Sequence, residues 1–409
     1  MRISTLSIYS NATSQLNTLQ SALARTQNQL STNRRILTPA DDPVASARAL
    51  EISQSKEMNT QFATNRTSAH SALATVEGAL QNAGNLMMDI EQLVVKAGNG
   101  AMLPSDREAL ATELEGRLAD LLGVANSTDG AGGYLFSGYM ATTQPFTQTP
   151  EGAAYQGDQG QRMLQVAASR RVPLSASGSA VFEGGKTGNG TFQTQAADAN
   201  RGTGVISSGS VTDRGLAQAG RDYKLTFAVT DDIPAITTYS VVEVTGTGVE
   251  VPVAPDQPYQ SGKAISFNGM SFDIKGEPAN GDSFTVEPSE RQSVFTTVTD
   301  LVAALRAPVD NPADKTALAN RLNTALDNVQ LAHDNVLTIQ ASVGAHMKEL
   351  DFLDSAGDGL DVQYAATLSG LQDLDMVKTI SDFAMQQTTL QAAQMSFKTM
   401  SGLSIFNYL

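Results

Sequence analysis

The chain of 409 residues has no cysteine, no tryptophan and only three histidines, and aromatic residues make up 6% of it. Without cysteine there is no thiolate nucleophile, no disulfide and no cysteine-ligated zinc. None of His70, His333 and His346 has a second histidine four residues away, so we expect no metal site and no cofactor. No nucleophile, base and orienting group can be assembled from the remaining residues. The sequence therefore predicts a protein that is not an enzyme.

Positive charge and long apolar runs are scarce as well. There are 27 Lys and Arg residues against 42 Asp and Glu, which gives a net charge of −15. Such a chain repels phosphate backbones, so we expect no nucleic-acid partner. No segment approaches the roughly 18 apolar residues of a membrane helix, and we expect no membrane insertion. The first residues lack a continuous apolar stretch, so a cleaved secretory signal is not expected either.

What the chain does contain is divided unevenly along its length. Residues 1–138 and 291–409 are rich in Ala, Leu, Gln and Asn and almost free of proline, whereas residues 139–290 hold most of the Gly, Thr, Val and Pro clusters. This division predicts an α+β fold. In it, a long α-helical coiled-coil rod is built from both chain ends, and an antiparallel β-rich domain is inserted between them.

The helical signal at both ends is a heptad repeat, with apolar residues at alternating spacings of three and four. One repeat in the N-terminal part comprises Ala12, Leu16, Leu19, Leu23, Thr26 and Leu30. The next comprises Leu73, Val76, Leu80, Ala83, Met87, Ile90, Val94 and Ala97. The longest comprises Leu318, Leu322, Ala325, Val329, Ala332, Val336, Ile339, Val343, His346, Leu350 and Leu353. The last helix carries Met376, Phe383, Leu390 and Phe397, with Ile380 beside them. A sustained 3.5-residue period predicts narrow seams packed in a left-handed supercoil; the alternative is an ordinary helical bundle.

Two helix starts can be placed from local signals. Asp41 and Asp42 precede Pro43, and carboxylates at a helix N-terminus act as caps, so a helix should begin at Pro43. A second helix should open at Pro312 and run to about Ser355.

The middle region alternates in the manner of half-buried strands. Residues 223–229 and 239–244 are examples, and Asn268-Gly269 separates two alternating runs in the pattern of a β-hairpin. We expect one or two small antiparallel units. The predicted domains are an inner terminal helical domain, an outer coiled-coil domain and a β-rich insert, with boundaries at 1–43 plus 360–409, 44–138 plus 291–359, and 139–290.

The chain ends present long apolar seams on thin helices. Two such helices bury little surface in a monomer and are marginal alone, so we expect them to order when they meet partner subunits. The alternative is a C-terminal helix that docks on its own domain. The predicted assembly interface consists of Leu16, Leu19, Leu23, Leu30, Ile380, Phe383, Leu390, Phe397, Met400, Leu403 and Phe406.

Several segments resemble one known family. Residues 1–5 (MRIST) and 29–32 (QLST) are similar to the start of proteins of the flagellin superfamily. Residues 39–43 (PADDP), 133–138 (GYLFSG) and 403–409 (LSIFNYL) resemble its hook-associated branch. One departure is Asn33, where a glycine is usual; asparagine tolerates left-handed backbone better than most residues, so we expect no functional change.

The resemblance implies a structural axial component of the bacterial flagellum that joins the hook to the filament. It implies extracellular location after export, without signal cleavage, through the flagellar type III channel. The implied partners are other copies in a homo-oligomeric ring, hook-associated protein 1 on the hook side, flagellin on the filament side, and an export chaperone at the C-terminal helix.

Two other functions remain open at this stage. The chain could be a flagellin-like filament subunit, although residues 39–43 and the final residues favour the hook-associated branch. A ligand-binding module in the β insert is an alternative of another class, which the scarcity of aromatic residues disfavours.

Overall fold

The structure is a computed structural model that describes residues 5–217, 220–230, 235–246 and 248–402. The chain divides into two compact units. We call residues 1–65 with 352–409 the terminal unit and residues 66–351 the central unit.

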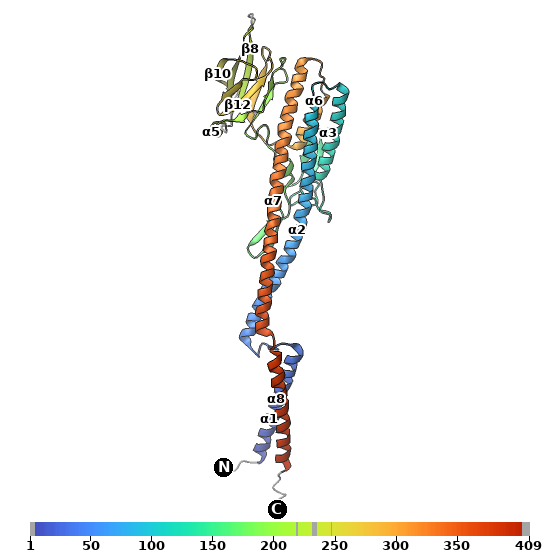
Figure 1. Cartoon of the computed structure of the whole chain (residues 1–409), viewed down its shortest axis with the longest axis vertical. Coiled ribbons are helices and arrows are strands. Elements are labelled where there is room, and N and C mark those ends of the chain that lie inside the picture. The colour runs from blue at the N-terminus through green and yellow to red at the C-terminus, as the bar shows by residue number, and fades with distance from the viewer. Residues whose placement is uncertain (1–4, 218–219, 231–234, 247, 403–409) are drawn as a thin grey trace, which may run out of the picture. The chain divides into compact units, whose positions relative to one another are not determined.

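Both chain ends are helical, as the sequence predicts, and antiparallel strands lie between them (Figure 1). The long helices are α1 (Thr5–Thr32), α2 (Pro43–Ala97), α3 (Pro104–Ala125), α6 (Val294–Arg306), α7 (Pro312–Gln372) and α8 (Met376–Gly402). Two short helices, α4 (Gly178–Phe182) and α5 (Arg214–Ala217), lie among the strands. The predicted fold class is confirmed.

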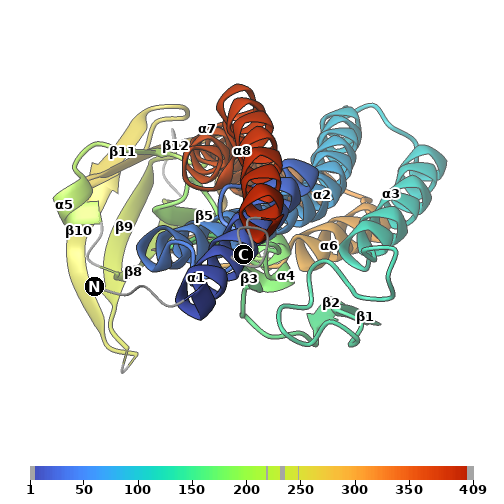
Figure 2. The ribbon, with the colours of Figure 1, turned by 90° about the horizontal axis from the view of Figure 1, so that it is seen from below.

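In the central unit, α2 and α7 run antiparallel and bury the predicted heptad seams. The Gln330 side-chain amide donates to the Glu91 carboxylate at 2.8 Å, which fixes their register. The buried seam residues of α2 are Leu73, Val76, Leu80, Ala83, Met87, Ile90, Val94 and Ala97. Those of α7 are Leu322, Ala325, Val329, Ala332, Val336, Val343 and Leu350. Helices α3 and α6 pack against each other on the side of α2, as Figure 2 shows.

The predicted end of α7 near Ser355 is wrong, because the helix continues to Gln372. Glycines at 357 and 359 are typical of a helix end, but each costs a helix interior only about 1 kcal/mol. Gly357 is buried, and its carbonyl accepts a hydrogen bond of 2.8 Å from the Asn59 side chain of α2. The missing side chain at Gly357 thus allows close contact between the two helices.

An aromatic cluster forms part of the core of the central unit. Phe146, Phe182 and Phe295 are fully buried, and their ring centroids lie 5.0–5.7 Å apart. Phe136 joins them edge-to-face against Phe182 at 5.5 Å, and its carbonyl accepts from the Tyr155 hydroxyl at 2.9 Å. The 133–138 segment therefore serves core packing.

The β insert contains two main antiparallel sheets. Strand order is β10-β9-β8-β13-β5 in one and β11-β12-β6 in the other, with β7 pairing with β12. The strands of the first sheet are β5 (Phe192–Ala196), β8 (Asp222–Val229), β9 (Thr237–Val244), β10 (Glu250–Pro258) and β13 (Ser283–Pro288). Those of the second are β6 (Val205–Ile206), β7 (Ser210–Val211), β11 (Ala264–Phe267) and β12 (Met270–Lys275). A single apolar cluster joins the two sheets.

The predicted hairpin is present between β11 and β12. Its turn residues Asn268 and Gly269 have φ angles of 44° and 76°, the left-handed values that such a two-residue turn requires. Two further hairpins lie outside the sheets: β1 (Phe146–Thr149) with β2 (Gly152–Tyr155), and β3 (Met163–Ala167) with β4 (Arg170–Pro173).

A row of asparagines on α7 holds the insert and adjoining segments by their backbone. Asn320 accepts from the Ile206 N–H and donates to the Gly204 carbonyl, both at 3.0 Å. Asn328 accepts from the Gly188 N–H at 2.9 Å, and Asn335 donates to two carbonyls of α4. This attachment was not predicted, because polar residues on a helix usually indicate a solvated face.

Candidate assembly surface on the terminal helices

The two terminal helices, α1 and α8, pack against each other as an antiparallel pair (Figure 2). The Arg35 N–H donates to the Gln372 carbonyl at 2.8 Å at one end of the pair. The Thr26 hydroxyl donates to the Gln386 side-chain oxygen at 3.0 Å in the middle. Near the other end, the rings of Tyr9 and Phe397 meet edge-to-face with centroids 5.2 Å apart.

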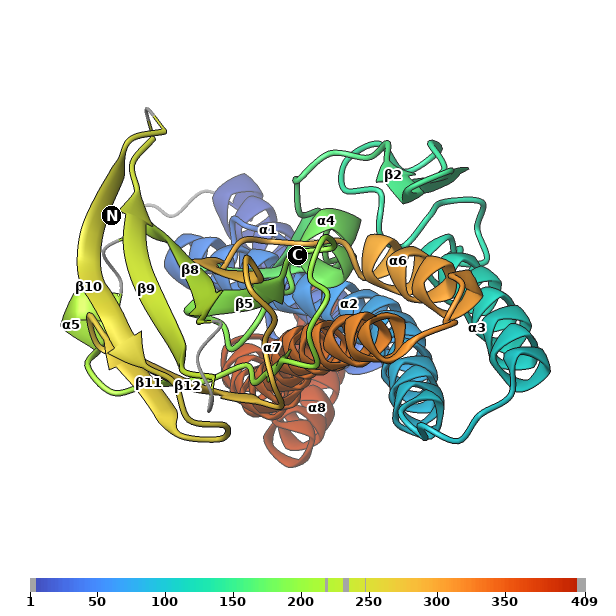
Figure 3. The same ribbon diagram turned by 90° about the horizontal axis from the view of Figure 1, so that it is seen from above.

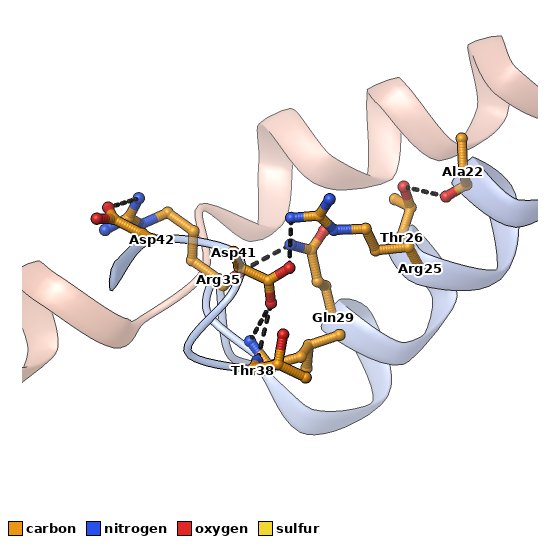
Figure 4. Close-up of polar contacts among 9 residues, drawn as sticks. Ala22, Arg25, Thr26, Gln29, Arg35, Thr38, Asp41 and Asp42 are labelled. Atoms are coloured by element: carbon orange, nitrogen blue, oxygen red, sulfur yellow. Dashed lines mark hydrogen bonds and ion pairs between the residues drawn. The ribbon is translucent and has the colours of Figure 1, made fainter. Parts of the chain in front are cut away.

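A tightly bonded loop leads from α1 to α2 (Figure 4). The Asp41 carboxylate accepts from the N–H groups of Thr38 at 2.8 Å and Leu37 at 2.9 Å, and it pairs with Arg25 at 2.8 Å. The backbone donors, Thr38 first, hold the pKa of Asp41 below its usual value, and the Arg25 charge adds to the effect. The loop is therefore closed by an ionised carboxylate.

The prediction that both carboxylates cap a helix is right for Asp42 and wrong for Asp41. Asp42 accepts from the Ala45 N–H at 3.0 Å, the geometry of an N-cap before Pro43. Asp41 instead bonds to the backbone of its own loop. At Asn33, the φ of 53° confirms that this residue takes the left-handed backbone where the resembled family usually has glycine.

Burial in this helix pair is shallow. Thr26, at 7% exposed, is the one buried side chain among those described in α1 and α8. Seven of the predicted interface residues are half-buried: Leu16, Leu19, Leu23, Leu30, Phe383, Leu390 and Phe397. Ile380 and Met400 are exposed, whereas Leu403 and Phe406 lie outside the described residues. The structure thus brings seven of the predicted residues together and leaves the pair with no fully buried apolar side chain among those described.

Helix α8 carries a second apolar stripe that the sequence analysis did not separate from the first. Val377, Ile380, Ala384 and Met395 follow spacings of three, four and eleven, so they share one face of the helix. All four are exposed, Val377 by 83% and Met395 by 65%. Ile380, one of the predicted interface residues, is therefore exposed on this outer stripe in the single chain. A second series counted from Val377 gives this stripe, but polar residues between Ala384 and Met395 interrupt it in the sequence.

Within the described residues we searched for a metal site and for a membrane-spanning helix, and found neither. In residues 5–402, apart from the three short internal gaps, no cluster of three His, Asp or Glu side chains is placed to hold a metal ion. Over the same residues, every helix is too short or too polar to span a lipid bilayer.

Comparison with known proteins gives a consistent result. The model of the bacterial flagellin N-terminal helical region matches residues 3–141. Flagellar hook-associated protein 3 of Escherichia coli K12 is 27% identical over 407 residues, which cover 99% of both chains. The crystal structure of hook-associated protein 3 from Legionella pneumophila is 32% identical, with a TM-score of 0.72 over 78% of this chain and 98% of that one. The crystal structure of FlgL from Xanthomonas campestris is 31% identical, with a TM-score of 0.70 over 78% and 99%.

The chain belongs to the hook-associated protein 3 family. Proteins of this family are structural components of the flagellar hook–filament junction, and this is the function that the comparisons assign. The flagellin alternative is disfavoured, because flagellin of Serratia marcescens matches only 31% of this chain and 36% of its own length.

Proposed function

We propose that this hook-associated protein 3 family member polymerises through its terminal helix pair into a homo-oligomeric ring. In this proposal the ring joins the hook to the filament mechanically, without catalysis. The supporting observation is the shallow burial of α1 and α8, which leaves the seam between them only half-buried and the outer stripe of α8 exposed. Apolar surface of this kind gains about 25 cal/mol for each Å² that a neighbouring subunit covers.

The proposal includes the neighbours of the ring and its route of assembly. Hook-associated protein 1 contacts the hook side and flagellin the filament side, and an export chaperone covers the C-terminal helix beforehand. The chain reaches the cell exterior through the flagellar export channel without signal cleavage. Family resemblance supports these partners, and the exposed stripe on α8 supplies a surface that a chaperone can shield. The inner terminal domain, outer coiled-coil domain and β insert keep their predicted boundaries in this proposal.

The experiment that tests the proposal introduces two charges into the terminal seam. The variant Leu390→Asp/Phe397→Asp is expressed in cells that lack the chromosomal gene, and filament attachment is scored by electron microscopy. We expect bare hooks and unattached flagellin in the medium, because an unpaired carboxylate is costly in a subunit contact. The matched control is Ser381→Asp/Ser396→Asp, which adds the same charge at two exposed positions of α8 away from the seam. Normal filaments on the double seam variant would refute the proposal.

Limited proteolysis of the free monomer gives an independent test. We expect α1 and α8 to be removed while the central unit resists, since its seams are buried. Equal resistance of the two units would mean that the ends are already docked within one chain.

A further inference from the structure

A polar pocket, which we call the β5–α7 pocket, lies in the central unit between the β insert and two helices. Its cavity volume is about 330 Å³, and its walls come from β5, the loop after β5, α6 and α7. Strand β5 is the last strand of the five-stranded sheet, and Figure 3 shows it between the rest of that sheet and these helices. All the walls belong to one compact unit, so the pocket is present in the single chain.

Two asparagines of α7 hold the walls of the pocket in place. Asn320 bonds to the backbone of residues 204 and 206. Asn328 accepts from the Gly188 N–H at 2.9 Å and donates to the Gln292 side-chain oxygen at 3.1 Å. Small alanine and glycine residues make up much of the remaining wall and leave the space open. The pocket is therefore preformed, as ligand sites usually are.

The wall formed by β5 carries an amide without a partner. Gln193 is only 8% exposed, and its side chain makes no hydrogen bond to any described residue. The neighbouring Phe192 belongs to the apolar cluster of the insert, and the Thr194 hydroxyl donates to the Ser207 carbonyl at 2.9 Å. Because side chains alternate along a strand, Gln193 points to the opposite face, where the pocket lies. A buried amide in this state is costly unless something in the pocket bonds to it.

Two groups on the helical side of the pocket are in the same state. The side-chain N–H groups of Gln292 have no acceptor, and the Thr324 hydroxyl of α7 has no partner, in the part of the chain that the structure describes. Together with Gln193, these groups offer hydrogen-bond donors and acceptors to one cavity. None of the described lining residues is aromatic. This inventory suits a ligand with an amide group and not an aromatic one.

The charged residues of the pocket carry an excess of negative charge. They are Asp198, Asp300 and Arg321, two carboxylates against one guanidinium. Arg321 pairs with Asp198 at 2.8 Å, whereas Asp300 makes no hydrogen bond or ion pair with the described residues. Burial raises the pKa of Asp300, and the charge of Arg321 offsets this only partly. A cationic group of a ligand would supply the missing partner of Asp300.

We propose that the β5–α7 pocket binds a small ligand that carries a primary ammonium next to an amide. The ammonium lies against Asp300, and the amide bonds to the free groups of Gln193, Gln292 and Thr324. An amino acid amide has this chemistry, and so does the free N-terminus of a short peptide. The pocket contains no residue of α1 or α8, so the inference does not depend on the proposed polymerisation.

Isothermal titration calorimetry of the full chain tests the proposal with glycinamide as the probe. We expect saturable binding of glycinamide and about tenfold weaker binding of acetamide, which lacks the ammonium, and of methylammonium, which lacks the amide. Triglycine amide distinguishes the two sources, because tighter binding than glycinamide indicates a peptide N-terminus and equal or weaker binding a free amino acid amide. If neither amide binds saturably, or if acetamide binds as well as glycinamide, the pocket holds only water and the proposal is overturned.

Two variants test whether the binding occurs in this pocket. Asp300→Asn and Gln193→Met should each weaken glycinamide binding about tenfold. The matched controls, Asp334→Asn and Gln257→Met, make the same changes at exposed positions outside the pocket and should bind normally. Without ligand, Gln193→Met should unfold at the parent's temperature or above it, because it removes a buried polar group that has no protein partner. If that variant does not fold, Thr324→Val replaces it. Unchanged binding by the folded pocket variants would overturn the proposal.

Discussion

The terminal and central units carry the same heptad pattern but bury it to different depths. On α2, Leu80, Met87 and Ile90 are fully buried, whereas on α8 the equivalent Phe383, Leu390 and Phe397 are only half-buried. The central unit also contains α3, α6 and the aromatic cluster, while α1 and α8 contact chiefly each other. A repeat therefore specifies which face of a helix packs, and the number of neighbouring elements decides how much is buried. The unit that lacks neighbours within the chain is the one suited to find them in other subunits.

The largest effect should come from a charge placed in the central seam. Leu80→Asp should unfold the central unit, because burying an unpaired carboxylate costs several kcal/mol. The same change at Leu390 should leave the thermal unfolding of the purified monomer nearly unchanged. Comparing the two variants by calorimetry checks the contrast, and similar losses at both positions would contradict it.

A truncation series should give the next largest difference. Phe295→Ala removes a fully buried ring from the aromatic cluster and should lower the free energy of unfolding by about 3–5 kcal/mol. Phe397→Ala should cost clearly less in the monomer, because its ring is already partly solvated. Urea denaturation measures both values.

Acidification should change the contributions of Asp327 in the central unit and Asp41 in the terminal unit with opposite sign. In the central unit, burial raises the pKa of Asp327 to about 6, partly offset by a hydrogen bond from Ser208. The folded state then binds a proton more tightly than the unfolded state, whose carboxyl titrates near 3.8. The contribution of Asp327 to the stability of the central unit should therefore rise as pH falls from about 7 to about 4.5, by roughly 1 kcal/mol after solvent screening. The difference in thermal unfolding between the parent and Asp327→Asn, scanned at graded pH, measures this contribution and should shrink to nothing if the pKa of Asp327 is not raised.

The smallest expected effect lies in the loop of the terminal unit. The pKa of Asp41 is lowered, so its contribution is present above the unfolded value of 3.8 and is lost as pH falls through the folded pKa. Asp41→Asn should loosen the loop at neutral pH and speed proteolytic cleavage between residues 33 and 42. Asp42→Asn, which can still cap α2, is the control. No difference between the variants would show that the Asp41 contacts do not hold the loop.

Much of the fold could be predicted from the sequence where a single local signal, such as heptad spacing or a turn dipeptide, determines the structure. The α2 and α7 seams follow from their heptads, and the β11–β12 hairpin follows from Asn268-Gly269. The end of α7 was missed because Gly357 serves helix contact there, and a glycine at a helix end looks the same in sequence. The attachment through Asn320 and its neighbours was missed because their partners are backbone atoms more than 100 residues away.

The candidate site could be predicted only in part. Seven of the predicted interface residues are half-buried in the α1–α8 pair, whereas Ile380 and Met400 are exposed. The outer stripe was missed because polar residues lie between Ala384 and Met395 and hide the repeat. Depth of burial is a property of the packed neighbours, and no spacing of residues along one helix encodes it.

Native-state hydrogen exchange of the purified monomer tests the central claim most directly. The account predicts strong protection of the α2 and α7 amides between residues 73 and 97 and between 322 and 350, and rapid exchange throughout α1 and α8. Protection of the terminal helices equal to that of the central seam would contradict it, because the ends would then be complete without a second subunit.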